Sequence, residues 1–325
     1  MDQNKIVSSD YVKESSPEFS VVITCYYEEK SIEEFHSRLS GALESLNRSY
    51  EIVFVNDGST DKTFEKLKMI FDKDPHVTTI IDLFRNAGQL GAMTAGINYA
   101  KGEHFVFMDS DLQLDPEELP LLIAQFDKGT DIVSGCRKKR KDPFFRIISS
   151  KIANLVVRKV SGHKVTDLGC TFKVYNGKLI RAFQLGPFKR FQTPYIYSKA
   201  QTYVEIPITH HPRKYGKSGW TFKSLFAFQM DNLVGISQRP FQLLSVFCII
   251  IAFIFFARIA SAWFVPFSML KEVTPGLILN IILLHLLLTL AVLSMVGEYV
   301  IRNFLALQRY PVYVIKKIYQ KKPKD

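Results

Sequence analysis

The chain has 325 residues, and its 42 basic and 31 acidic side chains give a formal net charge of +11 at neutral pH. This excess favours an anionic partner such as lipid headgroups, nucleic acid or a phosphorylated substrate, and charge alone does not choose among them. The four cysteines form no Cys-x-x-Cys pair, so zinc-ribbon and disulfide-scaffold proteins are excluded and a reducing compartment is expected.

The first secondary-structure elements are predicted from residue 19 onward. Residues 1–18 are polar and lack the apolar segment of a signal peptide, so we expect a disordered leader. The apolar run at 19–27 is typical of a buried parallel strand, and residues 31–47 follow with the apolar spacing of a helix. A second strand is expected at 50–55, ending at a polar turn before another helix.

Two further strand-and-helix units follow in the same order. The segment 77–84 predicts a third strand, a helix rich in small residues spans 88–100, and 103–111 predicts a fourth strand that ends in acidic residues. Strands that alternate with helices predict an α/β fold with a mostly parallel sheet. Such sheets bind ligands beyond the carboxyl ends of their strands, which is where Asp57 and Asp109 fall.

Two later segments have the composition of helices that lie on a membrane surface. A basic run at 137–141 leads into apolar residues at helical spacing, which predicts an interfacial amphipathic helix at about 143–160. A second, aromatic-rich interfacial helix is predicted at 218–240. The basic run adjoins an apolar helix rather than an aromatic stacking platform, so lipid is the simpler partner and no nucleic acid is expected.

Two apolar segments near the C-terminus are long enough to cross a bilayer, at about 241–265 and 276–301. The alternative is a pair of buried core helices, but those are usually shorter and amphipathic. The link at 266–275 carries one lysine and one glutamate, whereas the outer flanks are basic. The positive-inside rule therefore predicts a transmembrane hairpin with both flanks in the cytoplasm, including a basic tail at 302–325.

Acidic side chains alternate at the end of the fourth predicted strand. Asp109, Asp111 and Gln113 would project to the same side of an extended strand and could bind Mg²⁺ or Mn²⁺ through oxygen. Two carboxylates are a weak signal, because the same segment also looks like the start of a helix capped by Asp115. Both interpretations can hold at once.

Several stretches of the chain match the sequence pattern of a known family. The matching stretches are 21–29, 55–63, 83–102, 108–118, 135–137, 166–175 and 212–220. In this order they resemble the GT-A-fold glycosyltransferases of family 2, and within them the polyisoprenyl-phosphate sugar transferases such as dolichol-phosphate-mannose synthases and bactoprenol glucosyltransferases. The resemblance implies a GT-A nucleotide-sugar-binding catalytic domain over 19–217, followed by the two-helix transmembrane hairpin.

The resemblance also implies roles for the acidic residues. Glu28 and Asp57 are expected to hold the ribose and base of the nucleotide, and Asp109, Asp111 and Gln113 to bind the metal that bridges the donor diphosphate.

The basic residues are implied to bind phosphates of donor and acceptor. Those expected in this cradle are Arg137, Arg146, Ser150, Arg213 and Lys217. For Asp167 three roles stay open: orienting the acceptor, acting as an auxiliary base, or capping a helix or turn. His210 and His211 are interpreted as structural or solvated. The chain departs from the family pattern at Thr24, Tyr27 and Asn56, which bears on base recognition.

The implied reaction is an inverting, metal-dependent transfer of a hexose, with glucose from UDP-glucose as the expected donor, to undecaprenyl phosphate at the cytoplasmic membrane face. GDP-mannose, UDP-GlcNAc and an aminopentose donor are alternatives, as is a catalytically silent membrane scaffold or sugar-nucleotide sensor. A phosphate monoester is already ionised at neutral pH, so the acceptor should need positioning by cations more than deprotonation. Polar residues within the spans, such as His285, make homo-oligomerisation a further hypothesis.

Overall fold

The computed structural model describes residues 16–137, 162–215, 275–307 and 310–321, together with Asn154, Arg158 and Ile250. The chain divides into two units, one comprising Met1–Gln229 with Pro311–Asp325 and the other Met230–Tyr310. The first unit contains the sheet and every residue of the candidate site. The second contains one described long helix.

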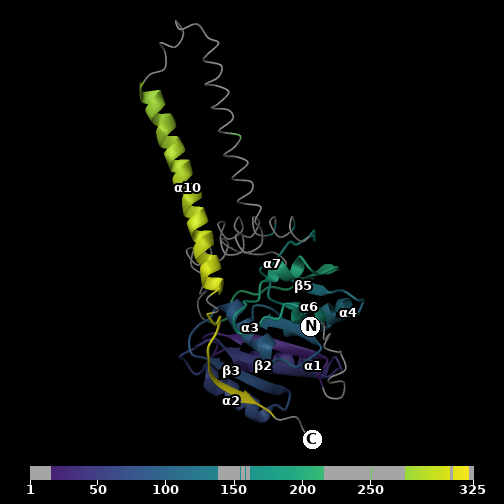
Figure 1. Cartoon of the computed structure of the whole chain (residues 1–325). Coiled ribbons are helices and arrows are strands. Elements are labelled where there is room, and N and C mark those ends of the chain that lie inside the picture. The colour runs from purple at the N-terminus through teal and green to yellow at the C-terminus, as the bar shows by residue number, and fades with distance from the viewer. Residues whose placement is uncertain are drawn as a thin grey trace, which may run out of the picture. The chain divides into compact units, whose positions relative to one another are not determined.

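Within the described residues, eight strands form one sheet in the order β7-β5-β6-β4-β1-β2-β3-β8 (Figure 1). The strands are β1 (Phe19–Cys25), β2 (Tyr50–Asn56), β3 (Val77–Leu83), β4 (His104–Asp109), β5 (Ile132–Arg137), β6 (Lys173–Tyr175), β7 (Tyr203–Ile208) and β8 (Ile315–Gln320). Strands β3, β2, β1 and β4 run parallel, whereas β6 and β8 are antiparallel to their neighbours. The mostly parallel α/β sheet is therefore confirmed.

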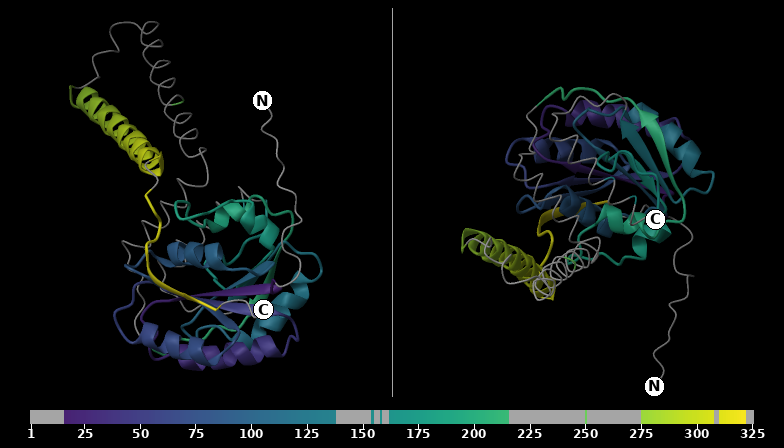
Figure 2. Two further views of the ribbon diagram at one scale, coloured as in Figure 1. Left: turned by 60° about the horizontal axis from the view of Figure 1, so that its bottom comes forward. Right: turned by 90° about the horizontal axis from the view of Figure 1, so that it is seen from above.

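Helices cover both faces of this sheet (Figure 2). They are α1 (Ile32–Glu44), α2 (Thr63–Lys73), α3 (Gln89–Tyr99), α4 (Leu119–Phe126), α6 (Gly177–Arg181) and α7 (Thr193–Tyr197), with a 3₁₀ turn η1 (Pro116–Glu118) before α4. Helix α1 contacts α2 and α4, which places these three on one face, and α3 packs on β1 and β2 from the other.

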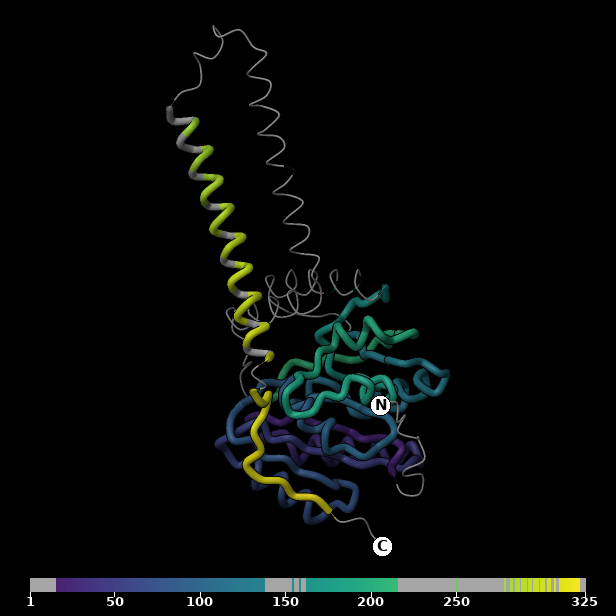
Figure 3. Tube along the Cα trace, viewed as in Figure 1, coloured from purple at the N-terminus to yellow at the C-terminus, as the bar shows by residue number. Residues whose placement is uncertain are grey.

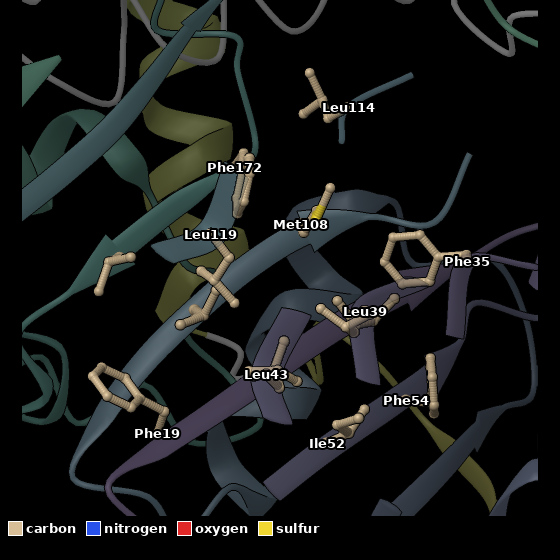
Figure 4. Packing of buried hydrophobic residues seen from close by; sticks show 14 of the residues in the cluster. Phe19, Phe35, Leu39, Leu43, Ile52, Phe54, Met108, Leu114, Leu119 and Phe172 are labelled. Carbon is tan, nitrogen blue, oxygen red and sulfur yellow. The ribbon is translucent and has the colours of Figure 1, made fainter. Parts of the chain in front are cut away.

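The main core lies between α1 and the central strands. Helix α1 is amphipathic, and its buried stripe of Phe35, Leu39 and Leu43 packs on strand side chains including Ile52 and Phe54 (Figure 4). Burial of this apolar surface, at roughly 25 cal/mol per Å², is the main force that holds the helix to the sheet. It also fixes the carboxyl ends of β1, β2 and β4 at one edge.

Helix α3 approaches the opposite face unusually closely because it is built from small residues. A Cβ on Gly96 would lie 2.3 Å from the side chain of Val22 and 3.2 Å from that of Val55, so a larger residue would push the helix away. The small-residue helix expected at 88–100 is therefore confirmed. Its small residues allow it to pack closely on the sheet.

The last strand, β8, pairs antiparallel with β3 at the edge of the sheet (Figure 3). Tyr319 packs against Phe64 and Phe71 of α2, with ring centroids 6.0 and 6.3 Å apart. Tyr313 is buried and its hydroxyl accepts a hydrogen bond from Asn98 at 2.8 Å. The sequence predicted only a basic tail here, because a charged, half-exposed edge strand gives little local signal.

The described helix of the second unit is α10 (Pro275–Leu307). Among the described residues it is the one helix long and apolar enough to cross a membrane, over Leu284–Ile301. It coincides with the second predicted span. The first predicted span and the interfacial helices at 143–160 and 218–240 fall outside the described residues, apart from Asn154, Arg158 and Ile250, so the hairpin stays a prediction.

The packing of β8 predicts a stability effect. Tyr319→Ala should lower the free energy of unfolding by about 2 kcal/mol, because it removes a ring packed against two others. Ile318→Ala is the matched control on the same strand, since Ile318 is 37% exposed, and should cost about 1 kcal/mol or less. Thermal unfolding of the full chain in detergent, followed by near-ultraviolet circular dichroism, measures both. Equal losses would show that β8 is not docked through Tyr319.

Candidate active site

The candidate site lies where three parallel strands end. Cys25 of β1 is paired with Asn56 of β2, and Thr24 with Asp109 of β4, so the segments that follow these strands leave the sheet side by side. Asp109 is the last residue of β4, and Glu28, Asp57 and Asp111 stand in the segments that follow the strands. A further segment, after β7, brings Arg213 to the same place.

Asp109 is held in position by two side chains from other elements. Its carboxylate accepts hydrogen bonds from Gln89 Nε2 at 2.6 Å and from Thr171 Oγ1 at 2.7 Å. Burial raises the pKa of Asp109, and the nearby charge of Asp111 raises it further. The sequence analysis missed Gln89 and Thr171, although an amide and a hydroxyl are ordinary partners for a desolvated carboxylate.

Asp111 carries the ion pair at the centre of the site. Its Oδ2 lies 2.7 Å from Arg213 Nη2, and its Oδ1 accepts a hydrogen bond from the backbone N–H of Gln113 at 3.1 Å. The Asp111 side chain is only 9% exposed. A carboxylate this buried requires a cation or strong donors, and Arg213 supplies one.

The strand geometry predicted for Asp109, Asp111 and Gln113 is wrong. Strand β4 ends at Asp109, and Leu112 adopts the left-handed backbone conformation with φ 59°, so the chain turns instead of alternating. The Gln113 side-chain amide donates to the carbonyl of His211 at 3.3 Å. The two aspartates still meet at the site, but Gln113 is engaged with the segment that carries Arg213.

Glu28 belongs electrostatically to the same cluster. Burial raises its pKa to about 7; a hydrogen bond from Ser31 opposes this, and the charges of Asp111 and Asp109 add to it. The backbone N–H of Glu28 donates to Thr63 Oγ1 at 2.9 Å, which fixes the residue over the start of α2. Glu28 is therefore a largely desolvated carboxyl that lies in the field of both aspartates.

Asp57 has a different environment. Its Oδ1 accepts a hydrogen bond from the backbone N–H of Ala87 at 2.6 Å, which ties the end of β2 to the loop before α3. The next residue, Gly58, has φ 72°, and a Cβ there would lie 2.6 Å from the backbone of Arg85, so only glycine fits. Asp57 thus shapes the loop, and its expected contact with the nucleotide stays a prediction.

The departure at Asn56 has a local reason. Asn56 Nδ2 donates to Asp82 Oδ1 at 2.7 Å, and both side chains are buried. An aspartate at position 56 would face Asp82 as a like charge, which is costly in a buried setting. An amide at this position therefore replaces repulsion by a hydrogen bond.

Arg137 and Asp167 form a second, separate ion pair. Asp167 Oδ2 lies 2.7 Å from Arg137 Nε and Oδ1 lies 2.7 Å from Nη2, so the pair is bidentate. The contact shows that Asp167 orients the guanidinium of Arg137, a role that was not foreseen, and the three roles left open for Asp167 stay predictions. Lys217, Arg146 and Ser150 lie outside the described residues, so their predicted roles are not tested.

The carboxylates at the site could supply part of the ligand shell of a hard divalent cation. In the part of the chain that is described, no three histidine, cysteine, aspartate or glutamate side chains gather closely enough to form a ligand set. Asp109 and Asp111 could nevertheless supply two carboxylates, and Mg²⁺ usually completes its shell with water and substrate phosphates. Burial is the largest cause of the raised pKa values of Asp109 and Glu28, and a bound cation would favour the charged forms of both.

A family model described as glycosyl transferase family 2 matches residues 20–184. The undecaprenyl-phosphate 4-deoxy-4-formamido-L-arabinose transferase of Edwardsiella ictaluri is 33% identical over 239 residues, 73% of this chain and 74% of the relative. The enzyme of the same description from Salmonella dublin is 34% identical over 235 residues, 72% of either chain.

Solved structures confirm the GT-A-like α/β fold. Glucosyl-3-phosphoglycerate synthase from Mycobacterium tuberculosis, in complex with Mn²⁺, UDP-glucose and phosphoglyceric acid, matches with a TM-score of 0.51 and 14% identity. The match covers 68% of this chain and 78% of that one.

The raised pKa of Glu28 predicts a pH-dependent stability effect. The folded state holds this proton up to about pH 7, so wild-type stability falls as pH rises from about 4.5 to about 7. Glu28→Gln removes the charge, and we expect it to be more stable than wild type at pH 8 by roughly 1–2 kcal/mol, with the difference shrinking towards pH 5.

Unfolding in EDTA at both pH values measures this difference. Glu29→Gln is the control, because it removes a charge from the adjacent position, and it should show no comparable gain. A Glu28→Gln variant less stable than wild type at pH 8 would contradict the conclusion that burial disfavours the charged form of Glu28.

Proposed function

Because the chain belongs to glycosyl transferase family 2, we propose that it transfers a sugar from a nucleotide donor to undecaprenyl phosphate. The observation that carries the proposal is the meeting of Asp109, Asp111 and Arg213 at the carboxyl edge of the sheet, on a chain whose relatives are undecaprenyl-phosphate transferases. An acid pair beside an arginine suits a diphosphate donor and an anionic acceptor.

The proposed donor sugar is 4-deoxy-4-formamido-L-arabinose, carried on UDP. The relatives are described as transferases of this sugar, and none of them supports the glucose that the sequence analysis expected. Among the alternatives kept open, the aminopentose is therefore favoured over GDP-mannose and UDP-GlcNAc.

Asp109 and Asp111 would hold Mg²⁺ or Mn²⁺, which, when bound, would offset the charge of the donor diphosphate. Gln89 and Thr171 keep the Asp109 carboxylate in place for this role. Arg213 lies against Asp111 and can reach a phosphate oxygen next to it. The proposed reaction needs no general base, because the acceptor phosphate is ionised before it binds.

Arg137 is proposed to hold the acceptor phosphate, with Asp167 fixing the plane of its guanidinium. The bidentate pair leaves Arg137 little rotational freedom, which lowers the entropy lost when a phosphate binds. Arg146, Ser150 and Lys217 are proposed to complete this cradle.

Topology gives the proposal a second support. Strands β1 to β7 and strand β8 belong to one sheet, so they lie on one side of any membrane. The chain between Tyr215 and Tyr310 must then cross the bilayer an even number of times. If α10 is one crossing, a second is required, and the apolar segment at 241–265 is the candidate.

A panel of donors and acceptors tests the reaction. Purified protein with undecaprenyl phosphate should form glycolipid from UDP-4-deoxy-4-formamido-L-arabinose in preference to UDP-glucose, UDP-GlcNAc and GDP-mannose. It should not use undecaprenol, which lacks the ionised nucleophile. Glycolipid is measured after lipid extraction. Equal use of the alcohol would refute the acceptor, and preference for another donor would refute the sugar.

The same assay tests the acidic pair. Asp111→Asn should lower transfer by at least about a hundredfold, because it weakens both the metal site and the contact to Arg213. Asp127→Asn, which alters a surface ion pair with Arg48, should leave transfer unchanged. Transfer should also stop in EDTA and return with Mg²⁺ or Mn²⁺; full turnover in EDTA would exclude the metal.

Topology is tested with a membrane-impermeant maleimide. A cysteine introduced as Ser268→Cys, between the two proposed spans, should be labelled in intact spheroplasts. Lys317→Cys, at an exposed position of β8, should react only after lysis. The opposite pattern, or labelling of both before lysis, would contradict the hairpin.

A further inference from the structure

The 166–168 loop, which lies between β5 and β6 in the chain, is held almost entirely by side chains. It belongs to no helix or strand, yet all three of its N–H groups and all three of its carbonyl groups have hydrogen-bond partners. The buried Asn154 contacts both ends: its amide group donates to the carbonyl of Thr166, and its oxygen accepts from the N–H of Leu168 at 3.2 Å. The loop therefore has one preferred conformation, because any other would break several hydrogen bonds at once.

Glu205 of β7 holds the first half of the loop. Its Oε1 accepts hydrogen bonds from the N–H of Thr166 at 2.8 Å and from the N–H of Asp167 at 3.1 Å, and its Oε2 accepts one from the hydroxyl of Thr166. The hydroxyl of Tyr203, on the same strand, donates to Oε1 at 2.6 Å. The carboxylate is thus fixed by its own strand and in turn fixes the loop, through bonds that its charge strengthens.

Lys173 of β6 holds the other half of the loop. Lys173 and Glu205 both pair with Ser134 of β5, the strand between theirs, so their side chains stand on the same face of the sheet. Lys173 is 4% exposed, and its Nζ donates to the carbonyl of Leu168 at 2.9 Å. Burial lowers the pKa of Lys173 to about 8, so the amine still carries most of its charge at neutral pH. An anion from β7 and a cation from β6 therefore hold the loop between them.

The loop presents the carboxylate of Asp167 to Arg137. This carboxylate is buried, and both of its oxygens lie 2.7 Å from nitrogens of the guanidinium. A displacement of the loop by on the order of 1 Å would break at least one of these two contacts, because hydrogen bonds weaken steeply beyond their usual length. A chain of contacts thus runs from Glu205 through Asp167 to Arg137.

We propose that Glu205 is a positioning residue for the acceptor: with Lys173 it holds the 166–168 loop so that Asp167 keeps the guanidinium of Arg137 in place for the acceptor phosphate. The inference rests on the proposed function, in which Arg137 holds that phosphate. Glu205 acts through the loop, so its loss should weaken acceptor binding and leave nucleotide binding unchanged. A guanidinium fixed in advance loses less entropy when the phosphate binds.

Glu205→Ala should raise KM for undecaprenyl phosphate about tenfold and change kcat at saturating acceptor by less than about threefold, because it loosens a binding contact. Its affinity for UDP, measured by calorimetry, should equal that of wild type. Glu205→Gln keeps an oxygen that can accept from both N–H groups, so its KM should stay within about threefold of wild type. Lys173→Met, which keeps the buried stem and removes the amine, is the second variant, and its KM for the acceptor should also rise.

Asp131→Ala is the matched control for a purely structural effect. Asp131 Oδ2 accepts hydrogen bonds from the N–H groups of Gln201 at 2.8 Å and Thr202 at 3.0 Å, at the opposite end of the same two strands. Its loss should lower the unfolding temperature but leave KM for the acceptor unchanged. An equal rise in KM in this control would overturn the inference, and so would a wild-type KM in both Glu205→Ala and Lys173→Met.

A double-mutant cycle tests whether Glu205 acts through Arg137. In an Arg137→Ala background, Glu205→Ala should raise KM for the acceptor no further, because the guanidinium that the loop positions is already gone. A full additional rise in KM would show that Glu205 acts by another route and would overturn the inference.

Failure of the inference and failure of the proposed function give different results. If wild type makes no glycolipid from undecaprenyl phosphate, the proposed function fails. Amide hydrogen exchange in the 166–168 loop then still tests the positioning: it should be at least about tenfold faster in Glu205→Ala than in wild type or Asp131→Ala, and equal rates would overturn it. If wild type makes glycolipid and Glu205→Ala and Lys173→Met keep its KM, only the inference fails.

Discussion

Negative charge gathered at one edge of the sheet is the constraint on which the rest of the site depends. Removing a carboxylate from water is costly unless donors or cations replace its hydration. Each acid has its own partners. Gln89 and Thr171 donate hydrogen bonds to Asp109, Arg213 pairs with Asp111, and Ser31 donates to Glu28. These partners come from different elements, so the charge cluster ties distant parts of the chain together. A cation bound at this edge would favour the charged forms of the buried acids.

The parts that could be predicted from sequence are those with local patterns. Strands β1 to β4 are continuous apolar runs, and α1 has a clear helical stripe, so burial dictates both. The pairing of β8 could not be foreseen, because its partner β3 lies more than 200 residues away and its own sequence is charged. The turn at Leu112 could not be predicted either, because leucine gives no signal for a left-handed backbone.

The partners of the two arginines could not be predicted for a similar reason. Basic residues at 137 and 213 were predicted to face phosphates, but nothing in their spacing names Asp167 or Asp111 as partners. Both pairs join residues brought together only by the folded sheet. In each case a guanidinium expected to await a substrate already has a carboxylate beside it, so binding of a phosphate must share or exchange that contact.

The position of β8 after α10 in the chain has a consequence for biosynthesis. Every other described strand of the sheet has left the ribosome before α10 is made, yet the β3 edge stays unpaired until β8 emerges. An open edge strand is a site of mispairing. The order of synthesis therefore makes completion of the catalytic sheet wait for translation of the long apolar helix, so that a chain truncated within that helix would expose the edge to other proteins.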